Sequence, residues 1–353
     1  MVAKMSDVAR EAGVSKKTVS NALNDYPYMR PETKQRVLEA AARLNYVRNE
    51  SARALRSGRS HTIGLVLPDL KNAYFAELAD AIMESAERVG YKVVIHQAKG
   101  VRERELESLH SGTLGALDGI LLNVLALGDA DADLFVSDVP IVLLGDHLSV
   151  TPADHVTMAN VDAARSMTDF LLETGHRRIA VVGAHRGEVI GSAGLRLRGY
   201  REALEAHGVA FDEDLIGYVD RWHRSDGAAM MGEILDRGIE IDAVFGLNDM
   251  LALGVLRTLR ERGVAVPEDV SVVGYDDIEE AQYALPALTT VDPGVQTIAQ
   301  KSVERLLARI GGDTGAPQRF ESPHSIRVRE STRDRTEAEQ RLSTEVAASS
   351  PTD

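Results

Sequence analysis

The chain has 353 residues, of which 44% are hydrophobic and 27% charged, and a formal net charge of −14. This length allows two or three hydrophobic cores, and the composition is typical of a globular protein. No apolar stretch has the length of a membrane span or the pattern of a secretory signal. The chain contains no cysteine, which excludes disulfides and thiolate metal sites and suits a reducing cytoplasm. The net charge argues against nucleic-acid binding by the molecule as a whole.

The charge is unevenly distributed along the chain. Residues 1–59 contain 12 Lys or Arg and 6 Asp or Glu, whereas the remainder contains 28 and 48. A small basic module joined to a large acidic body indicates a polyanion partner for the basic module alone. Chance clustering of surface charges is the alternative, and charge alone does not decide between the two.

The first sixty residues predict three short helices. Ser6 is a candidate cap for a helix through Glu11, and Gly13 tolerates the positive φ of the turn that follows. Ser15 then caps a second helix, whose apolar side is Val19, Ala22 and Leu23. Pro31 opens a third helix, whose apolar stripe is Val37, Leu38, Ala41 and Leu44. A helix, a turn with glycine and a second helix form the helix-turn-helix pattern.

The second helix has a polar side that is suited to DNA. A recognition helix presents its N-terminal residues to base edges in the major groove, where lysine donates to guanine and asparagine pairs with adenine. Hydroxyl groups and a helix N-terminus suit phosphate oxygens. The candidate major-groove residues are Ser15, Lys16, Lys17, Thr18, Ser20 and Asn21. A solvated polar face on a small helical domain explains the same residues equally well.

Residues 48–60 form a candidate hinge after a DNA-binding domain of residues 1–47. Asn49 can cap a short helix that carries Arg53, Arg56 and one apolar side chain, Leu55. Such a helix is too short and polar to be stable alone. Two copies in a dimer could enter a minor groove, with the leucines as wedges that kink the duplex. An arginine-rich flexible linker is an equally good interpretation.

From Thr62 onward, short β-rich runs alternate with amphipathic helical segments. The expected strands are 62–68, 91–96, 117–123, 139–145, 178–183, 241–246 and 269–276. The expected helices are 75–89, 161–174, 196–207, 249–262 and 295–310. Strands that are apolar throughout indicate parallel sheets covered on both faces. Two such series indicate two α/β subdomains, with a ligand crevice where the carboxyl ends of their strands face each other.

Polar and aromatic side chains follow several of these strands. Aromatic rings stack on the aliphatic face of a sugar, and planar polar groups bind its hydroxyls in pairs. The candidate crevice residues are Asp69, Asn72, Tyr74, Phe75, Asp146, Arg196, Trp222, Asn248 and Asp276. Each has an ordinary alternative: the aromatic residues could pack in the core, and Asn248 could cap the helix that follows it.

Basic residues crowd the single tryptophan at Arg221, His223 and Arg224. A cationic rim would favour an acidic or phosphorylated sugar. Pairing of these residues with Asp220 and Asp226 on the surface of a helix start is the preferred interpretation.

Five longer segments keep a fixed order and spacing from about Met5 to about Arg333: MSDVAREAGVSKKTVSNALN, RPETKQRVLEAAARLNY, NESARALRSGRSHTIGLVLPD, LNDMLALGVLRTLRERGVAVPEDVSVVGYDD and PALTTVD. Together they resemble the lactose-repressor (LacI/GalR) family of transcription regulators. The resemblance implies an all-α helix-turn-helix headpiece and an α/β core like that of periplasmic binding proteins, with two doubly wound parallel-sheet subdomains.

We expect the core to occupy residues 61–330. Its first subdomain is predicted at about 61–160 plus 292–318, and its second at about 161–291 plus 319–330. The polar composition of residues 331–353 predicts a disordered tail, and the tail has no leucine heptad for a tetramer.

The resemblance also implies roles in DNA recognition. Lys16 and Lys17 would be the main base readers, and Asn21 stands where arginine is more frequent, which implies a different operator preference. Leu55 would be the leucine wedged into the central step of the operator. The residues along the minor groove would be Asn49, Ala52 and Arg53.

For the crevice, the resemblance implies contacts of Arg196, Asn248 and Asp276 with sugar hydroxyls and a stacking surface at Trp222. We therefore expect a cytoplasmic homodimeric repressor that binds double-stranded operator DNA. Its operator affinity would be controlled by a small-molecule effector, a sugar or a sugar derivative, and it would need no metal, cofactor, catalysis or membrane. A sugar-binding transport protein is the alternative, which the basic module and the missing signal peptide disfavour. An α/β enzyme is less favoured, because no GxGxxG, P-loop or catalytic cluster is present.

Overall fold

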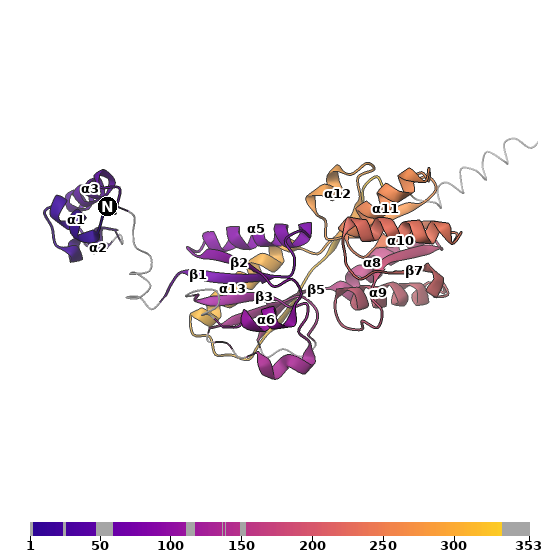
Figure 1. The fold of residues 1–353 in the computed structure, drawn as a ribbon, viewed down its shortest axis with the longest axis horizontal. Helices are drawn as coiled ribbons and strands as arrows, with labels where there is room; N and C mark the ends of the chain where they lie inside the picture. Colours follow the sequence, from indigo (N-terminus) through magenta and orange to yellow (C-terminus); the bar gives the residue numbers. More distant parts are fainter. Residues whose placement is uncertain are drawn as a thin grey trace, which may run out of the picture. The chain divides into compact units, whose positions relative to one another are not determined.

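The computed structural model describes residues 3–23, 26–46, 59–110, 117–135, 137, 139–148 and 153–333. The chain divides into two compact units, Met1–Ser60 and His61–Asp353 (Figure 1). Each unit has hydrophobic core clusters of its own. The predicted hinge residues Asn49, Ala52, Arg53 and Leu55 lie outside the described residues, as does the tail from residue 334.

The first unit consists of three helices, α1 (Met5–Glu11), α2 (Lys16–Leu23) and α3 (Pro31–Arg43). Their core is formed by buried side chains that include Val8, Val19 and Val37. Two predicted features of the turn between α1 and α2 are confirmed. Gly13 has a φ of +64°, and the Ser15 hydroxyl oxygen accepts the N–H of Thr18 at 3.0 Å.

Two details of this unit differ from the prediction. Helix α1 begins before Ser6, and its start is stabilised instead by the Asp7 carboxylate, which accepts the N–H of Lys4 at 2.9 Å. In α3 the side chain of Leu38 is 40% exposed, whereas Ala40 is fully buried. Because each residue turns a helix by about 100°, the buried stripe passes through residues 37, 40, 41 and 44.

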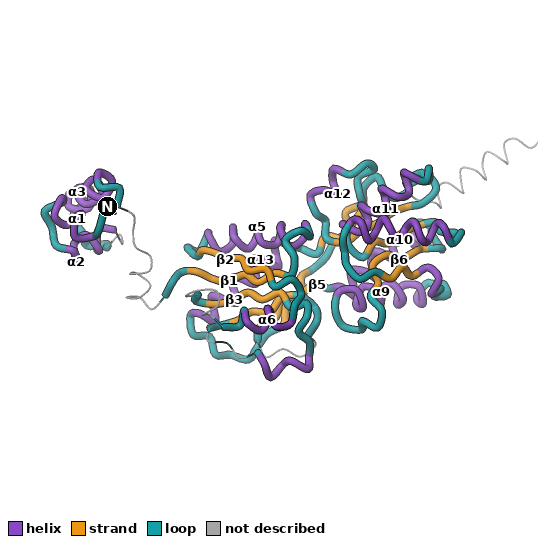
Figure 2. Tube along the Cα trace, viewed as in Figure 1, coloured by secondary structure: helices purple, strands orange, loops and turns teal. Residues whose placement is uncertain are grey.

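The second unit contains two six-stranded sheets with helices on their faces (Figure 2). The order of the first sheet is β11-β5-β4-β3-β1-β2, and all its paired strands are parallel. Its strands are β1 (Thr62–Leu67), β2 (Lys92–Gln97), β3 (Gly119–Asn123), β4 (Ile141–Leu144), β5 (Asp154–Met158) and β11 (Arg319–Ser322). Its helices are α5 (Ala73–Glu87), α6 (Arg102–Glu107) and α13 (Val295–Ile310), with a 3₁₀ helix at Asp129–Leu134.

The order of the second sheet is β12-β10-β9-β8-β6-β7, in which only the β10–β12 pair is antiparallel among the described strands. Its strands are β6 (Ile179–Ala184), β7 (Ile216–Tyr218), β8 (Ala243–Gly246), β9 (Ser271–Tyr275), β10 (Thr289–Asp292) and β12 (Ser325–Arg327). Its helices are α8 (Asn160–Glu173), α9 (Ser192–Ala206), α10 (Arg224–Asp236), α11 (Asp249–Glu261) and α12 (Glu279–Tyr283), with a 3₁₀ helix at Glu213–Leu215. The predicted fold, a helical headpiece and two parallel-sheet subdomains, is confirmed.

The subdomain boundary near the C-terminus is wrong in the prediction. Strand β11 was expected in the second subdomain, but it pairs with β5 in the first sheet, with Arg319 opposite His155. The chain therefore enters the second sheet between Ser322 and Ser325. Strand β5 itself was not predicted, because its sequence DHVTM is polar although all five residues are buried.

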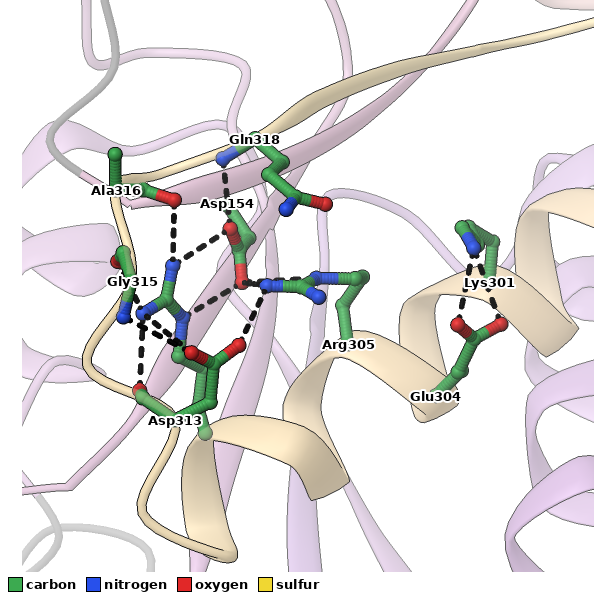
Figure 3. A network of polar contacts seen from close by, with 9 residues as sticks. Asp154, Lys301, Glu304, Arg305, Asp313, Gly315, Ala316 and Gln318 are labelled. Carbon is green, nitrogen blue, oxygen red and sulfur yellow. Dashed lines mark hydrogen bonds and ion pairs between the residues drawn. The ribbon is translucent and has the colours of Figure 1, made fainter.

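A network around Asp154 holds the returning segment against β5 (Figure 3). The Asp154 carboxylate accepts the N–H of Gln318 at 2.8 Å and donors from Arg305 and Arg309 of α13 at 2.8–3.2 Å. Burial by itself raises the pKa of Asp154, but these hydrogen bonds hold it below its usual value. The network thus fixes α13 and β11 to the edge of the first sheet.

No helix in the described ranges is long and apolar enough to cross a membrane.

Candidate functional site

A cavity of about 600 Å³ lies between the two subdomains of the second unit. Part of its lining comes from residues that end or follow strands of both sheets, and part comes from helices such as α5 and α9, so the expected crevice is present. The volume is within the range of small-molecule sites, about 300–1,000 Å³. All the predicted crevice residues except Asn248 line it: Asp69, Asn72, Tyr74, Phe75, Asp146, Arg196, Trp222 and Asp276. Contact of these residues with a ligand stays a prediction.

Asn248 fulfils the alternative role that the sequence allowed. Its side-chain oxygen accepts the N–H of Leu251 at 2.8 Å and caps α11. The residue is fully buried and does not line the cavity. Its amide nitrogen has no hydrogen-bond partner among the described residues. The structure therefore supports Asn248 as a cap and not as part of the cavity wall.

The deepest polar part of the cavity lining, called the cavity floor below, is formed by the buried residues Arg196 and Asp276. Arg196 of α9 is its polar centre, with only 2% of its surface exposed. Its guanidinium donates to the Asn160 side-chain oxygen at 2.7 Å and to the Leu247 carbonyl. It also lies 3.8 Å from the Asp276 carboxylate and 3.4 Å from the centre of the Tyr275 ring. Arg196 therefore ties α8, α9, β8 and β9 together as well as facing the cavity.

Asp276 follows β9 at the cavity floor and is 4% exposed. Burial raises its pKa to about 7, although the Arg196 guanidinium opposes the shift. Its φ of +121° is rare for a residue with a side chain, and such backbone conformations concentrate at functional sites. At neutral pH this carboxyl group is therefore available in both its protonated and its ionised form.

Aromatic rings line the cavity on both subdomains. On the first, Tyr74 and Phe75 meet edge to face with ring centres 5.2 Å apart. On the second, the Trp222 indole N–H donates to the Gly183 carbonyl at 2.8 Å, and the His185 ring lies 5.6 Å away. Because its edge is held in this way, the Trp222 ring has a fixed orientation in the cavity wall.

Side chains from the two subdomains contact each other across the cavity, and one such contact joins Arg196 to the Met158 sulfur at 3.3 Å. The Ser192 hydroxyl donates to Asp146 at 2.9 Å, and the His223 Nε2 atom lies 3.7 Å from the Asp69 carboxylate. Asp146 also accepts the hydroxyl of Thr157. These contacts join the two walls directly.

The preferred interpretation, in which the basic residues around Trp222 pair with Asp220 and Asp226, is confirmed for Arg221 but not for the side chains of His223 and Arg224. Arg221 lies 4.0 Å from Asp226 and is largely exposed, and Arg224 pairs with Glu280 at 2.9 Å. Arg221 and His223 nevertheless contribute to the cavity lining.

Several cavity residues were missed by the sequence analysis: Lys71, Gln97, Lys99, Asn123, His147, Thr157, His185, Glu188 and Ser192. Gln97, Lys99 and Asn123 end or follow predicted strands, so the strand-end rule could have identified them. No sequence pattern pointed to Glu188, because its place in the cavity wall depends on how its loop folds. Its carboxylate accepts the N–H groups of Ala193 and Gly194 and contacts His185 at 2.7 Å.

In the first unit, the N-terminal part of α2 carries the candidate DNA-reading residues. Lys16 and Lys17 are exposed, and Thr18 and Asn21 are half-buried. Ser20 was expected on the same exposed side, but only 8% of it is accessible because it lies beside the core residue Val19. The exposed edge of α2 is therefore formed by Lys16 and Lys17, with Ser15 and Asn21 at its margins.

Residues 4–49 match the family model of bacterial regulatory proteins, lacI family, and residues 168–332 match a periplasmic binding protein-like domain. The chain is 36% identical over 333 residues to the HTH-type transcriptional regulator CelR of Thermobifida fusca. The matched region covers 92% of this chain and 96% of CelR. The chain belongs to the lacI family. The resemblance of the five sequence segments is thereby confirmed.

Solved structures of lacI-family proteins agree with this assignment. A LacI-family transcriptional regulator from Sanguibacter keddieii is 46% identical, covers 78% of this chain and 99% of its own, and has a TM-score of 0.72. The complex of CelR with cellobiose is 33% identical over 93% and 99% of the two chains, with a TM-score of 0.68. The lac repressor dimer bound to operator and an anti-inducer is 29% identical over 94% and 99%, with a TM-score of 0.81.

Proposed function

We propose that this lacI-family protein is a sequence-specific DNA-binding repressor whose operator affinity is controlled by a carbohydrate in the cavity. The observation that carries the proposal is the combination, in one chain, of a basic helix-turn-helix unit and a strand-end cavity with aromatic walls. The proposal assigns no catalysis to the chain, in line with the names of its relatives as transcriptional regulators. A transport protein would not use the basic headpiece.

The lining of the cavity supports a carbohydrate as the ligand. Trp222 and Phe75 offer ring faces from the two subdomains, and Asp276 and Asp69 offer oxygens for hydroxyl groups. No group of three or more His, Cys, Asp or Glu in the described part of the chain is arranged to hold a metal ion. The cellobiose complex of CelR supports the same ligand class.

Exposed apolar side chains support a homodimer. Strand β2 forms an edge of the first sheet, and Val94 and Ile95 on it are exposed. In the second subdomain Tyr283 and Leu285 are 72% and 80% exposed. Apolar surface on an unpaired sheet edge favours association with another chain. A two-fold dimer would place two headpieces on the half-sites of a pseudo-palindrome, and the relative solved with operator is a dimer.

The proposal also assigns a role in DNA binding to the hinge, residues 48–60. Leu55 would act as the minor-groove wedge of each subunit, accompanied by Asn49, Ala52 and Arg53. Ligand binding would then change the separation of the two hinges and so the operator affinity.

Substitution of both Lys16 and Lys17 by alanine is expected to remove sequence preference. Each base contact contributes about 1–3 kcal/mol of discrimination, so affinity for the preferred site should fall at least tenfold more than affinity for unrelated DNA. Fluorescence anisotropy on both duplexes measures the difference. Arg36→Ala, which removes an exposed charge from α3, is the control and should preserve the preference. An equal loss on both duplexes would contradict base reading.

Ligand affinity is expected to depend on pH through Asp276. Its pKa in the folded chain is about 7, so the carboxylate that accepts sugar hydroxyls is lost as the pH falls through this value. Titration calorimetry at several pH values should show weaker sugar binding below about pH 7. Because three histidines also line the cavity, Asp276→Asn decides the origin of the effect and should flatten the profile. An unchanged profile in that variant would assign the pH dependence elsewhere.

A further inference from the structure

A hydrogen bond outside the cavity lining links the two subdomains of the second unit. The Glu77 carboxylate on α5 accepts the backbone N–H of Glu279 at 2.8 Å. Glu77 belongs to the first subdomain, and Glu279 is the first residue of α12 in the second. Neither residue lines the cavity, so this contact is available to respond to a ligand without touching it.

Both ends of this hydrogen bond are close in the chain to the cavity wall. Tyr74 and Phe75, which line the cavity, lie in the same turn of α5 as Glu77. On the other side, Asp276 lines the cavity three residues before Glu279. A displacement of either wall therefore reaches the contact through one turn of backbone.

The segment between Asp276 and Glu279 is held firmly enough to transmit such a displacement. The N–H of Ile278 donates to the buried Asp249 carboxylate at 3.0 Å, and Arg329 donates to Asp277 at 2.5 Å. Asp276 and Asp277 both have positive φ values, which only a well-determined surrounding structure maintains. These contacts attach the segment to the start of α11 and to Arg329, so we expect it to follow a displacement of Asp276.

Opposing effects act on the pKa of the Glu77 carboxyl group. Burial raises the pKa of Glu77, the N–H of Glu279 lowers it, and the carboxylates of Glu280, Glu279 and Asp277 raise it further. The single N–H donor thus works against desolvation and like charge.

Helix α12 leads directly to exposed apolar surface. It ends at Tyr283, and Tyr283 and Leu285 are among the most exposed large apolar residues of the described chain. We propose that Glu77 is a positioning residue that couples closure of the cavity to the orientation of α12 and of the Tyr283 and Leu285 surface. The inference rests on the proposed function, which takes the cavity as the ligand site and this surface as part of the dimer interface.

The test uses the full chain without ligand and three variants. Glu77→Ala removes the acceptor, Glu77→Gln retains an acceptor oxygen, and Glu84→Ala removes an exposed carboxylate from the same helix. Alanine is a strong helix former, so α5 should persist in each alanine variant, which circular dichroism checks. Trp222, the single tryptophan of the sequence, reports on the cavity through its emission. Sedimentation velocity reports on the surface through the dimer dissociation constant.

In Glu77→Ala we expect a shift of the Trp222 emission together with a dissociation constant that rises by about tenfold. This is the change expected if the free energy of a hydrogen bond to a charged group is transmitted in full to the dimer interface. Glu77→Gln and Glu84→Ala should retain the native emission and a dissociation constant within about twofold of the native one. If Glu77→Gln retains the native emission and dissociation constant, the effect of Glu77→Ala comes from the lost hydrogen bond and not from substitution in general. An emission shift with an unchanged dissociation constant, or neither change, would overturn the coupling alone. A wild-type chain that sediments as a monomer would overturn the proposed dimer and the coupling with it.

Discussion

Replacing Arg196 by alanine should lower the free energy of unfolding of the second unit by roughly 3–5 kcal/mol, the usual cost of removing one partner of a buried ion pair. The loss arises because the guanidinium is buried and donates to Asn160 and the Leu247 carbonyl, both of which would lose a partner. The Asp276 carboxyl group would also lose the nearby cation that favours its ionised form. Urea denaturation followed by circular dichroism measures the change.

The same variant should abolish the response of operator affinity to sugar. The neighbouring Arg198 is the matched control, because it lies on the same helix but is exposed and pairs with Glu202 at 3.5 Å. Its replacement by alanine should cost less than about 1 kcal/mol, as is typical of exposed ion pairs. Equal stability of the two variants would contradict the assignment of Arg196 as the polar centre of the cavity floor.

Replacing Asp154 by alanine should also cost roughly 3–5 kcal/mol, because two largely buried arginines would lose their shared carboxylate. The effect should depend on pH. Since the pKa of Asp154 is depressed in the folded chain, its contribution is present above the usual value of 3.8 and is lost as the pH falls below it. The acid-dependent part of the stability should therefore be smaller in the variant.

The control for Asp154 lies on α13 itself. Glu304 is exposed and pairs only with Lys301 in Figure 3, at 3.0 Å, so Glu304→Ala should change stability by less than about 1 kcal/mol. Stability curves against pH for both variants measure the difference. A variant of Asp154 that is as stable as the Glu304 variant would show that the network does not hold α13 and β11 in place.

The cavity could be predicted from the sequence because one physical rule generates it. Apolar runs separated by helices indicate parallel strands, and the polar residues just after them, such as Asp69 and Asp276, must lie at one edge of a sheet. The same rule failed for Asn248, because a residue after a strand can turn back and cap the next helix. The distinction depends on a few ångströms of loop geometry that the sequence pattern does not contain.

Buried polar residues are the second reason why part of the structure could not be predicted from the sequence. Strand β5 escaped prediction because its buried polar side chains find their partners outside the strand: Asp154 in α13, His155 at the Gly145 carbonyl and Thr157 at Asp146. Helical periodicity likewise located Lys16 and Lys17 correctly on the exposed edge of α2, yet placed the buried Ser20 beside them. Periodicity gives the direction of a side chain, whereas its burial depends on what packs against it.

The most direct test of the account is to select a DNA site from random duplexes with the full chain and to measure its affinity with and without sugar. The sugar is the one that most raises the melting temperature in a thermal-shift series that begins with cellobiose. We expect the full chain to enrich one pseudo-palindromic site and its affinity to change at least fivefold with sugar, the lower end of typical couplings of about 1–3 kcal/mol. The chain from His61 onward should bind the same sugar and no DNA. Enrichment of no sequence, or a sugar that binds and leaves DNA affinity unchanged, would contradict the account.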